Sequence, residues 1–353
     1  MGDGGLSLSL LALALGAAFG LLAQLSRFCL VGGLRDWWQA GDAVRIRAFA
    51  LALVVALVGT QALVAAGLMP TGRSIYLQAG LSMPAMFVGG ALFGLGMVLA
   101  NGCGARSLVL LAGGNLRSLV VLLALGIGAY MVLSGVLVPL RTALVAVLGG
   151  GNPARAETLV DWAAVRLPGE WLSGNRARWT ITGLLAVALL AFALPGLRRA
   201  PVTLLAGAAI GALVVGGWYL TGHLGADDFE PMPVESLTFV APIGESLLYL
   251  MLASGMSAGF GVQVVAGVLL GAFAAALLRG RFSLQGFDSP GLMLRQLVGG
   301  VLMGAGGATA LGCSIGQGLT GLSTLALPSL VAMAGILAGA HVGLRGPLAR
   351  RLR

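Results

Sequence analysis

Two glycine-rich stretches, GGALFGLGMVLANGC at residues 89–103 and GGVLMGAGGATALGC at residues 299–313, decide the fold that we predict for this chain. Eight of their fifteen positions are identical, and a cysteine falls on a cysteine although the 353 residues include only three. Each stretch is an apolar run that stops at Gly-Cys, which predicts a helix broken inside an apolar environment. We interpret the pair as an internal repeat.

The composition around this repeat is typical of a membrane protein. Hydrophobic residues make up 58% of the chain and charged residues 9%, whereas an ordinary soluble domain is roughly 25% charged. The 58 glycines follow no collagen period, which favours helices packed backbone to backbone in lipid. We therefore predict an all-α polytopic membrane protein with about nine transmembrane helices, short broken or re-entrant helices and lipid as its surroundings.

The charged residues exclude several classes of protein. All 21 basic residues are arginine, so the chain has neither a P-loop lysine nor a Schiff-base lysine. The net charge of +9 lies in short loops between apolar runs, which indicates positive-inside orientation, and we expect no nucleic-acid partner. The N-terminal MGDGGLSLSLL lacks a positive n-region, which favours a retained first span over a cleaved signal peptide.

Nine apolar segments are long enough to span a membrane. A tenth, 236–256, contains Pro242, Gly244 and Glu245 and is expected to be re-entrant or tilted. We divide the chain into a first repeat half at 1–140, a polar loop with two connecting spans at 141–222, and a second repeat half at 223–353. The predicted spans cover residues 6–26, 44–68, 84–102, 116–140, 179–196, 202–221, 259–279, 292–312 and 326–344.

Arginines in the short loops predict the orientation of these spans. Residues 27–47 carry four arginines, residues 279–295 carry three, residues 198–199 form a pair, and the tail from Arg345 carries four. We expect that side to be cytoplasmic, with the C-terminus on it and the N-terminus periplasmic. The polar stretch 141–178 and the acidic loop 223–235, which carries Asp227, Asp228, Glu230 and Glu235, then lie outside.

With this orientation, the two copies of the strong repeat cross the membrane in opposite directions. The helix leading to Cys103 enters from outside and the helix leading to Cys313 enters from the cytoplasm, an arrangement typical of transporters. A weaker echo pairs Arg27-Phe28-Cys29 with Arg281-Phe282-Ser283, but the arginine count puts both of its copies on one face.

The broken helices are the candidate ligand site. Backbone groups exposed by a break are tolerated only where they line a cavity or meet a ligand, and the start of each following helix favours an anion. A thiol is a weak, polarizable donor that binds a sulfur anion and releases it again. The candidate binding and relay residues are Cys29, Cys103 and Cys313 with Gly102, Gly104, Asn101, Arg106, Gly312, Ser314 and Gln317.

Simpler interpretations stay open for these residues. Any one cysteine can be a small buried hydrophobe, and two of them can form a structural disulfide. Arg106 either neutralises an anion or snorkels to the interface, and Glu245 either carries protons or lies at the interface. The cysteines lack CxxC spacing and both histidines lie near span ends, so we predict no metal and no other cofactor.

Four motifs resemble the YeeE/YedE sulfur-transport family, over nearly the whole chain. The three cysteines coincide with those of its thiosulfate-uptake branch. The motifs are SRFCLVGGLRD at 26–36, NGCGARSLVLLAGGNLRSLVVL at 101–122, GFDSPGLMLRQLVGG at 286–300 and LGCSIGQGLTGLSTLALPSL at 311–330.

The resemblance implies an hourglass-like bundle in the bacterial inner membrane that imports thiosulfate. It further implies that Cys29, Cys103 and Cys313 contact the ion in succession, and that a small cytoplasmic TusA-like sulfur-carrier protein is the partner. Three alternatives stay open: a membrane sulfurtransferase or redox protein that uses a cysteine persulfide, a transporter of a related selenium species, and a structural subunit that transports nothing. No catalytic triad is readable, so we predict no enzyme.

Overall fold

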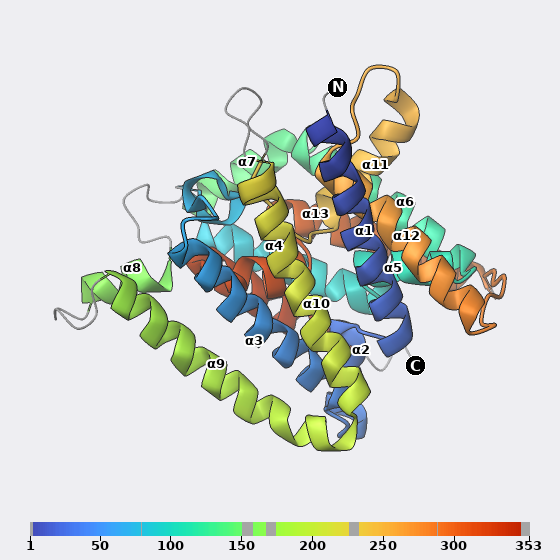
Figure 1. Cartoon of the computed structure of the whole chain (residues 1–353). Coiled ribbons are helices and arrows are strands. Elements are labelled where there is room, and N and C mark those ends of the chain that lie inside the picture. The colour runs from blue at the N-terminus through green and yellow to red at the C-terminus, as the bar shows by residue number, and fades with distance from the viewer. Residues whose placement is uncertain are drawn as a thin grey trace.

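A computed structural model describes residues 3–78, 80–149, 158–166, 174–225, 233–287 and 289–346 of the chain. Helices account for most of this part, and its strand-like pairing consists of three isolated bridges. In chain order (Figure 1) the elements are α1 (Asp3–Ser26), α2 (Leu30–Arg35), η1 (Asp36–Ala40), α3 (Val44–Ala65), η2 (Thr71–Arg73), η3 (Ile75–Leu77), α4 (Met83–Leu99), α5 (Gly104–Ala112), α6 (Leu116–Leu133), α7 (Val138–Val147), α8 (Leu159–Arg166), α9 (Gly174–Arg199), α10 (Pro201–Tyr219), η5 (Leu220–Leu224), α11 (Val240–Leu252), α12 (Phe260–Leu278), α13 (Pro290–Thr309), η6 (Gly316–Gly321) and α14 (Leu327–Arg345).

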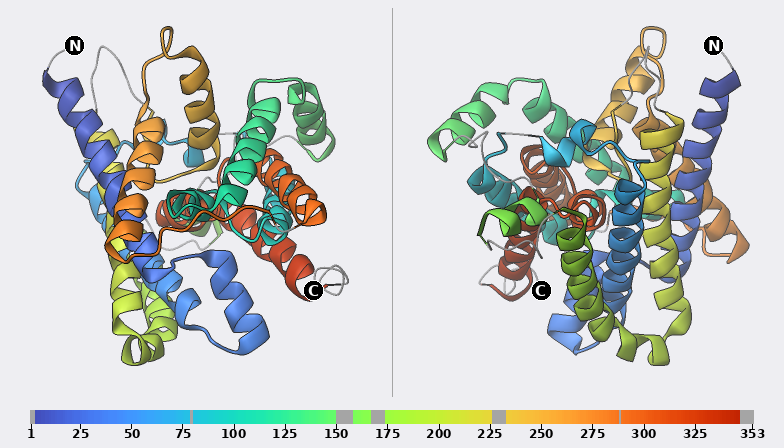
Figure 2. Two further views of the ribbon diagram at one scale, coloured as in Figure 1. Left: turned by 90° about the vertical axis from the view of Figure 1, so that its right-hand side faces the viewer. Right: turned by 60° about the vertical axis from the view of Figure 1, so that its left-hand side comes forward.

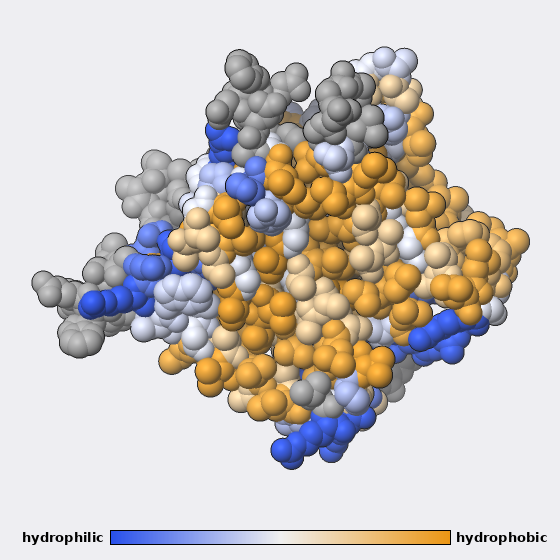
Figure 3. All heavy atoms as spheres, viewed as in Figure 1, coloured by the Kyte–Doolittle hydropathy of each residue, from blue (hydrophilic) through white to orange (hydrophobic). Residues whose placement is uncertain are grey.

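The helices confirm a polytopic all-α membrane protein. Eight helical stretches of the described chain are long and apolar enough to cross a membrane. The ninth predicted span forms α13, a helix of 20 residues whose hydropathy is lowered by Arg295 and Gln296 near its start. Apolar residues cover most of the face in Figure 3, and hydrophilic residues gather at its margins. The molecule therefore presents a lipid-facing surface between two polar ends.

The two copies of the strong repeat run in opposite directions. A Cβ atom at Gly89 on α4 would lie 2.8 Å from the carbonyl oxygen of Gly306 on α13. At Gly96, further along α4, it would lie 2.7 Å from the carbonyl oxygen of Gly299, which is earlier on α13. The two helices are therefore antiparallel, as the inverted repeat predicted. Only glycine permits this backbone-to-backbone approach.

The helices that carry the weaker echo are parallel. A Cβ atom at Gly16 on α1 would lie 2.2 Å from the oxygen of Val264 on α12, and at Gly20 it would lie 2.2 Å from the oxygen of Val268. The two segments that follow these helices and carry the echo differ in structure. Cys29 begins the helix α2, whereas Ser283 lies on a non-helical segment and its N–H donates to the carbonyl of Gly113 at 3.1 Å.

Residues 233–252 form the re-entrant segment that the sequence predicted. Val234 pairs with Ser74 in the loop after α3, and Val240 lies against Gly307 near the inner end of α13. Helix α11 then leads back toward the end of the bundle where α1 starts (Figures 1 and 2). The chain thus enters and leaves the bundle at one end.

The polar stretch 141–178 is more helical than a loop. It contains the end of α7, the whole of α8 and the first turns of α9. Thr158 and Asp161 explain the start of α8. The N–H of Asp161 donates to the Thr158 hydroxyl at 3.1 Å, and the Thr158 hydroxyl donates to the Asp161 carboxylate at 2.6 Å. Parts of the expected outer loops lie outside the described residues, among them Asp227, Asp228 and Glu230, as do the last three tail arginines.

The bundle has two distinct ends. Helices α1 and α12 finish close to Arg27 and Arg279, and α3 starts beside Arg45, at what we call the arginine end. The start of α1 and the segment 66–82 lie at the opposite end, which we call the N-terminal end (Figure 2). Helix α14 finishes at the arginine end, where Arg345 donates to the carbonyl of Trp38.

Candidate functional site: three cysteines at broken helices

Each cysteine lies at the same point of a broken helix. Helices α1, α4 and α13 all end at a residue with left-handed backbone, and a cysteine follows two residues later. The residue between them donates its N–H to a carbonyl five residues back, which is a Schellman ending. The left-handed residues are Arg27, Asn101 and Leu311 (φ 54°, 61° and 55°), and the bonds are Phe28 to Ala23 (3.2 Å), Gly102 to Met97 (3.0 Å) and Gly312 to Gly307 (2.8 Å).

These endings are strained, since none of the three left-handed residues is glycine. The breaks at Cys103 and Cys313 were predicted from the repeat, but the break at Cys29 was not. The spacing from Arg27 to Cys29, which equals that from Asn101 to Cys103, was the signal that the sequence offered. The motif therefore occurs three times in the bundle.

The three thiols differ in what they already bind. The sulfur of Cys29 accepts from the N–H of Gly32 at 3.4 Å, and the sulfur of Cys313 accepts from the N–H of Gly316 at 3.3 Å. Cys103 makes no such bond at the start of α5. All three are free thiols. A thiol that accepts through sulfur keeps its S–H available to donate, and Cys103 has both functions available.

Cys103 lies close to both of the other cysteines. Its thiol is within electrostatic range of both Cys29 and Cys313. Cys103 and Cys313 are buried, whereas Cys29 is half-buried toward the arginine end. Gly104, the residue after Cys103, lets α6 and α11 pack close to the start of α5, since a Cβ atom at Gly104 would lie 3.0 Å from Ile243 and 3.2 Å from Leu125. The thiols thus form a series through the packed centre.

Hydroxyl groups surround Cys313. A Cβ atom at Gly316 would lie 2.5 Å from the Thr238 hydroxyl and 3.2 Å from the Tyr76 hydroxyl, so both lie beside the residue that Cys313 binds. Ser314 is fully buried, and its hydroxyl has no hydrogen-bond partner among the described residues. Tyr76 is 1% exposed, and its hydroxyl lies beside that of Thr238. Buried polar groups are normally paired, so the unpaired hydroxyl of Ser314 suits a bound anion. The sequence analysis missed Tyr76 and Thr238.

Gln317 holds the second break in place. It is fully buried, and its amide nitrogen donates to the carbonyl of Ala310 at 2.5 Å, across the end of α13. Its amide oxygen has no partner among the described residues. The side chain therefore stabilises the turn before Cys313 and keeps one acceptor free.

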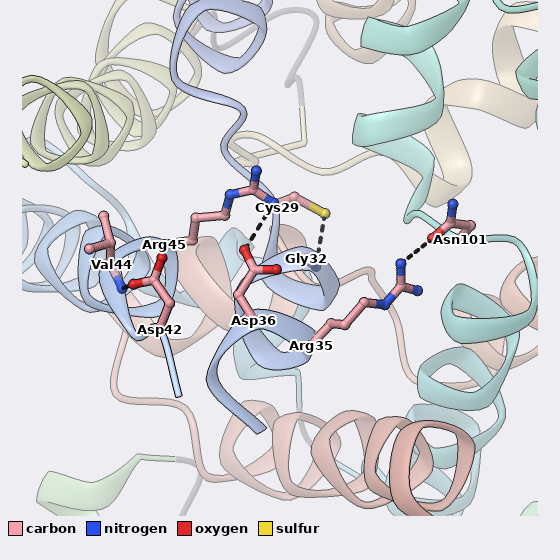
Figure 4. A network of polar contacts seen from close by, with 8 residues as sticks. All are labelled: Cys29, Gly32, Arg35, Asp36, Asp42, Val44, Arg45 and Asn101. Carbon is pink, nitrogen blue, oxygen red and sulfur yellow. Dashed lines mark hydrogen bonds and ion pairs between the residues drawn. The ribbon is translucent and has the colours of Figure 1, made fainter. Parts of the chain in front are cut away.

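Asn101 and Arg106 both lie toward the arginine end. The Asn101 side chain is exposed and accepts from Arg35 at 2.7 Å (Figure 4). Arg106, on α5, is within electrostatic range of Cys29 and Cys103. One of its guanidinium nitrogens is buried without a partner among the described residues. Arg106 is therefore a cation close to the thiols.

Two carboxyl groups lie on the side of the N-terminal end. Glu235 precedes the re-entrant helix, is within electrostatic range of Tyr76 and pairs through its backbone with the Thr221 hydroxyl. Burial, and next the neighbouring Glu245, raise the pKa of Glu235 to about 7. Glu245 lies on α11 against Gly261 at the start of α12. Glu235 is thus the acidic group nearer the hydroxyls.

Comparison with known proteins agrees with this architecture. Residues 25–342 match the sulphur transport family, a range that includes all three cysteines and the helix endings before them. The chain is 26% identical to the thiosulfate transporter TsuA of Escherichia coli over 339 residues, which is 89% of this chain and 87% of that protein. It is 27% identical to TsuA of Spirochaeta thermophila over 345 residues, which is 91% of this chain and 93% of that protein.

A shorter match is 36% identical over 93 residues to the probable transporter YedE of Salmonella typhimurium, covering 26% of this chain and 21% of that protein. The family match extends over the spans from α3 onward, the re-entrant segment and the three cysteines together. This multi-pass membrane protein therefore belongs to the sulphur transport family.

Proposed function

We propose that this chain is a thiosulfate importer in which Cys313, Cys103 and Cys29 hydrogen-bond the ion in succession. The observation that carries the proposal is the threefold occurrence of one motif, a strained helix ending followed by a cysteine, on helices that converge in the centre. The names of the two TsuA relatives support thiosulfate as the substrate. The protein acts as a transporter and catalyses no reaction.

The order of contacts follows from the surroundings of each thiol. The ion meets the hydroxyls of Tyr76, Thr238 and Ser314 beside Cys313, since these donors lie toward the N-terminal end. It then passes Cys103, whose sulfur makes no bond at the start of α5. Last it reaches Cys29, the half-buried thiol near the arginine end. Each thiol can hydrogen-bond the ion before the ion has left the previous one.

Neutral donors suit release better than a buried cation would. A unit charge 4 Å away contributes about 4 kcal/mol at an effective dielectric constant near 20, so a dianion would gain about 8 kcal/mol from one arginine. That corresponds to nearly six orders of magnitude in dissociation. A thiol contributes a small fraction of this energy, so the ion binds at several stations and still leaves each one.

The proposal includes a location and a partner. The family resemblance supports the bacterial inner membrane. The arginine count supports a cytoplasmic arginine end, so that the N-terminus is periplasmic and the C-terminus cytoplasmic. A small TusA-like sulfur carrier at the arginine end would receive the ion there.

Growth and uptake test the proposal together. A strain that depends on thiosulfate as its sole sulfur source should grow with this protein and grow more slowly with Cys103→Ala. Mass analysis of the purified protein during uptake should find unmodified thiols. A persulfide on any cysteine would instead support a sulfurtransferase, and equal growth of the variant would refute the series of thiols.

A further inference from the structure

A cavity of about 350 Å³ opens at the arginine end, beyond Cys29. Arginines from four helices or their ends line it: Arg27 after α1, Arg45 on α3, Arg106 on α5, and Arg279 with Arg281 after α12. We call these five residues and the space between them the arginine vestibule. No carboxylate among the described residues lines it.

The vestibule has more positive charge than its ion pairs explain. Arg45 pairs with Asp36 at 3.2 Å (Figure 4), and Arg279 donates to the carbonyl of Leu25 at 3.2 Å. Arg106 keeps a buried nitrogen unpaired among the described residues. Four of the five guanidinium groups are thus left without a carboxylate partner in the described chain. Such a concentration of like charge is unfavourable unless an anion enters.

Neutral hydrogen-bonding groups complete the lining. The amide of Asn115 donates to Gln285 at 3.1 Å, and Gln285 donates to Ser283 at 3.0 Å. The amide oxygen of Asn115 is buried without a partner among the described residues. Gln24 lines the same cavity. The cavity therefore has polar walls as well as charge.

Membrane orientation alone does not explain this arrangement. The positive-inside rule accounts for arginines in cytoplasmic loops, but it does not require side chains from four separate helices to line one cavity. Nor does it account for Arg106, which lies half-buried on a helix within the bundle and is within electrostatic range of two thiols. Through Arg106 the vestibule thus lies close to Cys29 and Cys103.

We propose that the arginine vestibule is a second anion-binding station, which holds a divalent oxyanion after it leaves the thiols. The inference rests on the proposed function. Arg27, Arg279 and Arg281 are exposed, so water screens their attraction and the ion can leave. The thiols bind through neutral donors and the vestibule through charge, so the ion moves toward the arginine end.

Equilibrium binding of radiolabelled thiosulfate to the purified full-length protein in neutral detergent tests this station. Binding should persist when all three cysteines are alanine, because the vestibule does not use them. In that background Arg27→Gln with Arg281→Gln should weaken binding about tenfold or more, since a dianion loses two nearby charges. The lysine pair at the same positions should restore most of the affinity.

The control removes two other arginines from the same end. Arg198 and Arg199 are exposed at the end of α9 and do not line the vestibule, so Arg198→Gln with Arg199→Gln should leave binding unchanged. Equal losses in both glutamine pairs, or no binding in the cysteine-free protein, would overturn the proposal. Displacement of the ion by phosphatidylglycerol but not by phosphatidylcholine would also overturn it, because the vestibule would then hold lipid headgroups.

Failure here is distinguishable from failure of the proposed function. Normal uptake by Cys103→Ala would refute the series of thiols whatever the vestibule binds. Unchanged binding in the Arg27 and Arg281 variants would remove the vestibule and leave the thiols standing.

Discussion

Replacing Cys103 by alanine is the most direct perturbation of the proposed pathway. Cys103 is 3% exposed and its sulfur makes no bond at the start of α5, so the substitution removes no hydrogen bond from the fold. The void left by one sulfur atom destabilises the protein by about 1 kcal/mol. The loss of folded protein should therefore be small, and any larger effect reports on transport.

The expected effect on transport follows from one lost donor. A hydrogen bond to a charged group is worth about 1.5–3 kcal/mol, and a thiol is a weak donor, so the lower value applies. Removing about 1.5 kcal/mol from the central station slows passage about tenfold. Cys103→Ser should also slow it, because a serine at this position caps the start of α5 and turns its hydroxyl away from the ion.

The assay is uptake of radiolabelled thiosulfate into proteoliposomes that contain equal amounts of each variant. Thr180→Ala on α9 is the control, since the Thr180 hydroxyl bonds only to carbonyls of its own helix. It should transport at the normal rate. Wild-type uptake by Cys103→Ala would show that the central thiol does not contact the ion, and the reasoning from the broken helices would be wrong.

Three further predictions follow from separate features. Gly271→Ala should lower the free energy of unfolding of the detergent-solubilised protein by about 2 kcal/mol or more, because the new Cβ atom would lie 1.9 Å from the carbonyl oxygen of Ala17. Gly183→Ala meets open space and should be neutral. Equal melting temperatures for the two variants would contradict the packing of α1 on α12. Uptake should fall as the pH rises through about 7, because Glu235 is neutral below its raised pKa and repels the anion above it. The Glu235→Gln variant should keep the low-pH rate at every pH. A pH profile in that variant equal to that of the unchanged protein would refute this role. Tyr76→Phe should raise the KM for thiosulfate about tenfold, since the buried hydroxyl beside Thr238 would no longer bind the ion, and a normal KM would place the ion elsewhere.

The series of thiols and the vestibule divide binding between two kinds of group. Donors without charge lie in the packed centre, where a buried cation would hold a dianion too tightly. Cations lie at the arginine end, where exposure to water weakens the attraction of Arg27, Arg279 and Arg281, while Arg45 and Arg106 are half-buried. The gradient from neutral to positive gives the ion a direction without a covalent step.

Hydropathy and the repeat determined most of the fold. Nine apolar segments predicted the helices α1, α3, α4, α6, α9, α10, α12, α13 and α14, since lipid requires long apolar helices. The fourth segment, 116–140, was predicted too long, because α6 ends at Leu133 and α7 starts at Val138. Pro242 and Gly244 predicted the re-entrant segment, and the matched Gly-Cys endings predicted two broken helices with opposite directions. These features depend on local sequence and on the membrane as solvent, so they are readable without tertiary contacts.

The assembly of the site was decided only in three dimensions. The sequence indicated three cysteines, but it did not show that Cys29 follows the same strained ending as Cys103 and Cys313, or that Cys103 lies close to both of the others. It also missed Tyr76 and Thr238, as well as the cavity shared by Arg27 and Arg281. These neighbours are up to 254 residues apart in the chain, as are Arg279 and Leu25. Their meeting depends on which glycine faces let two helices touch, and one sequence carries no record of which helix packs against which.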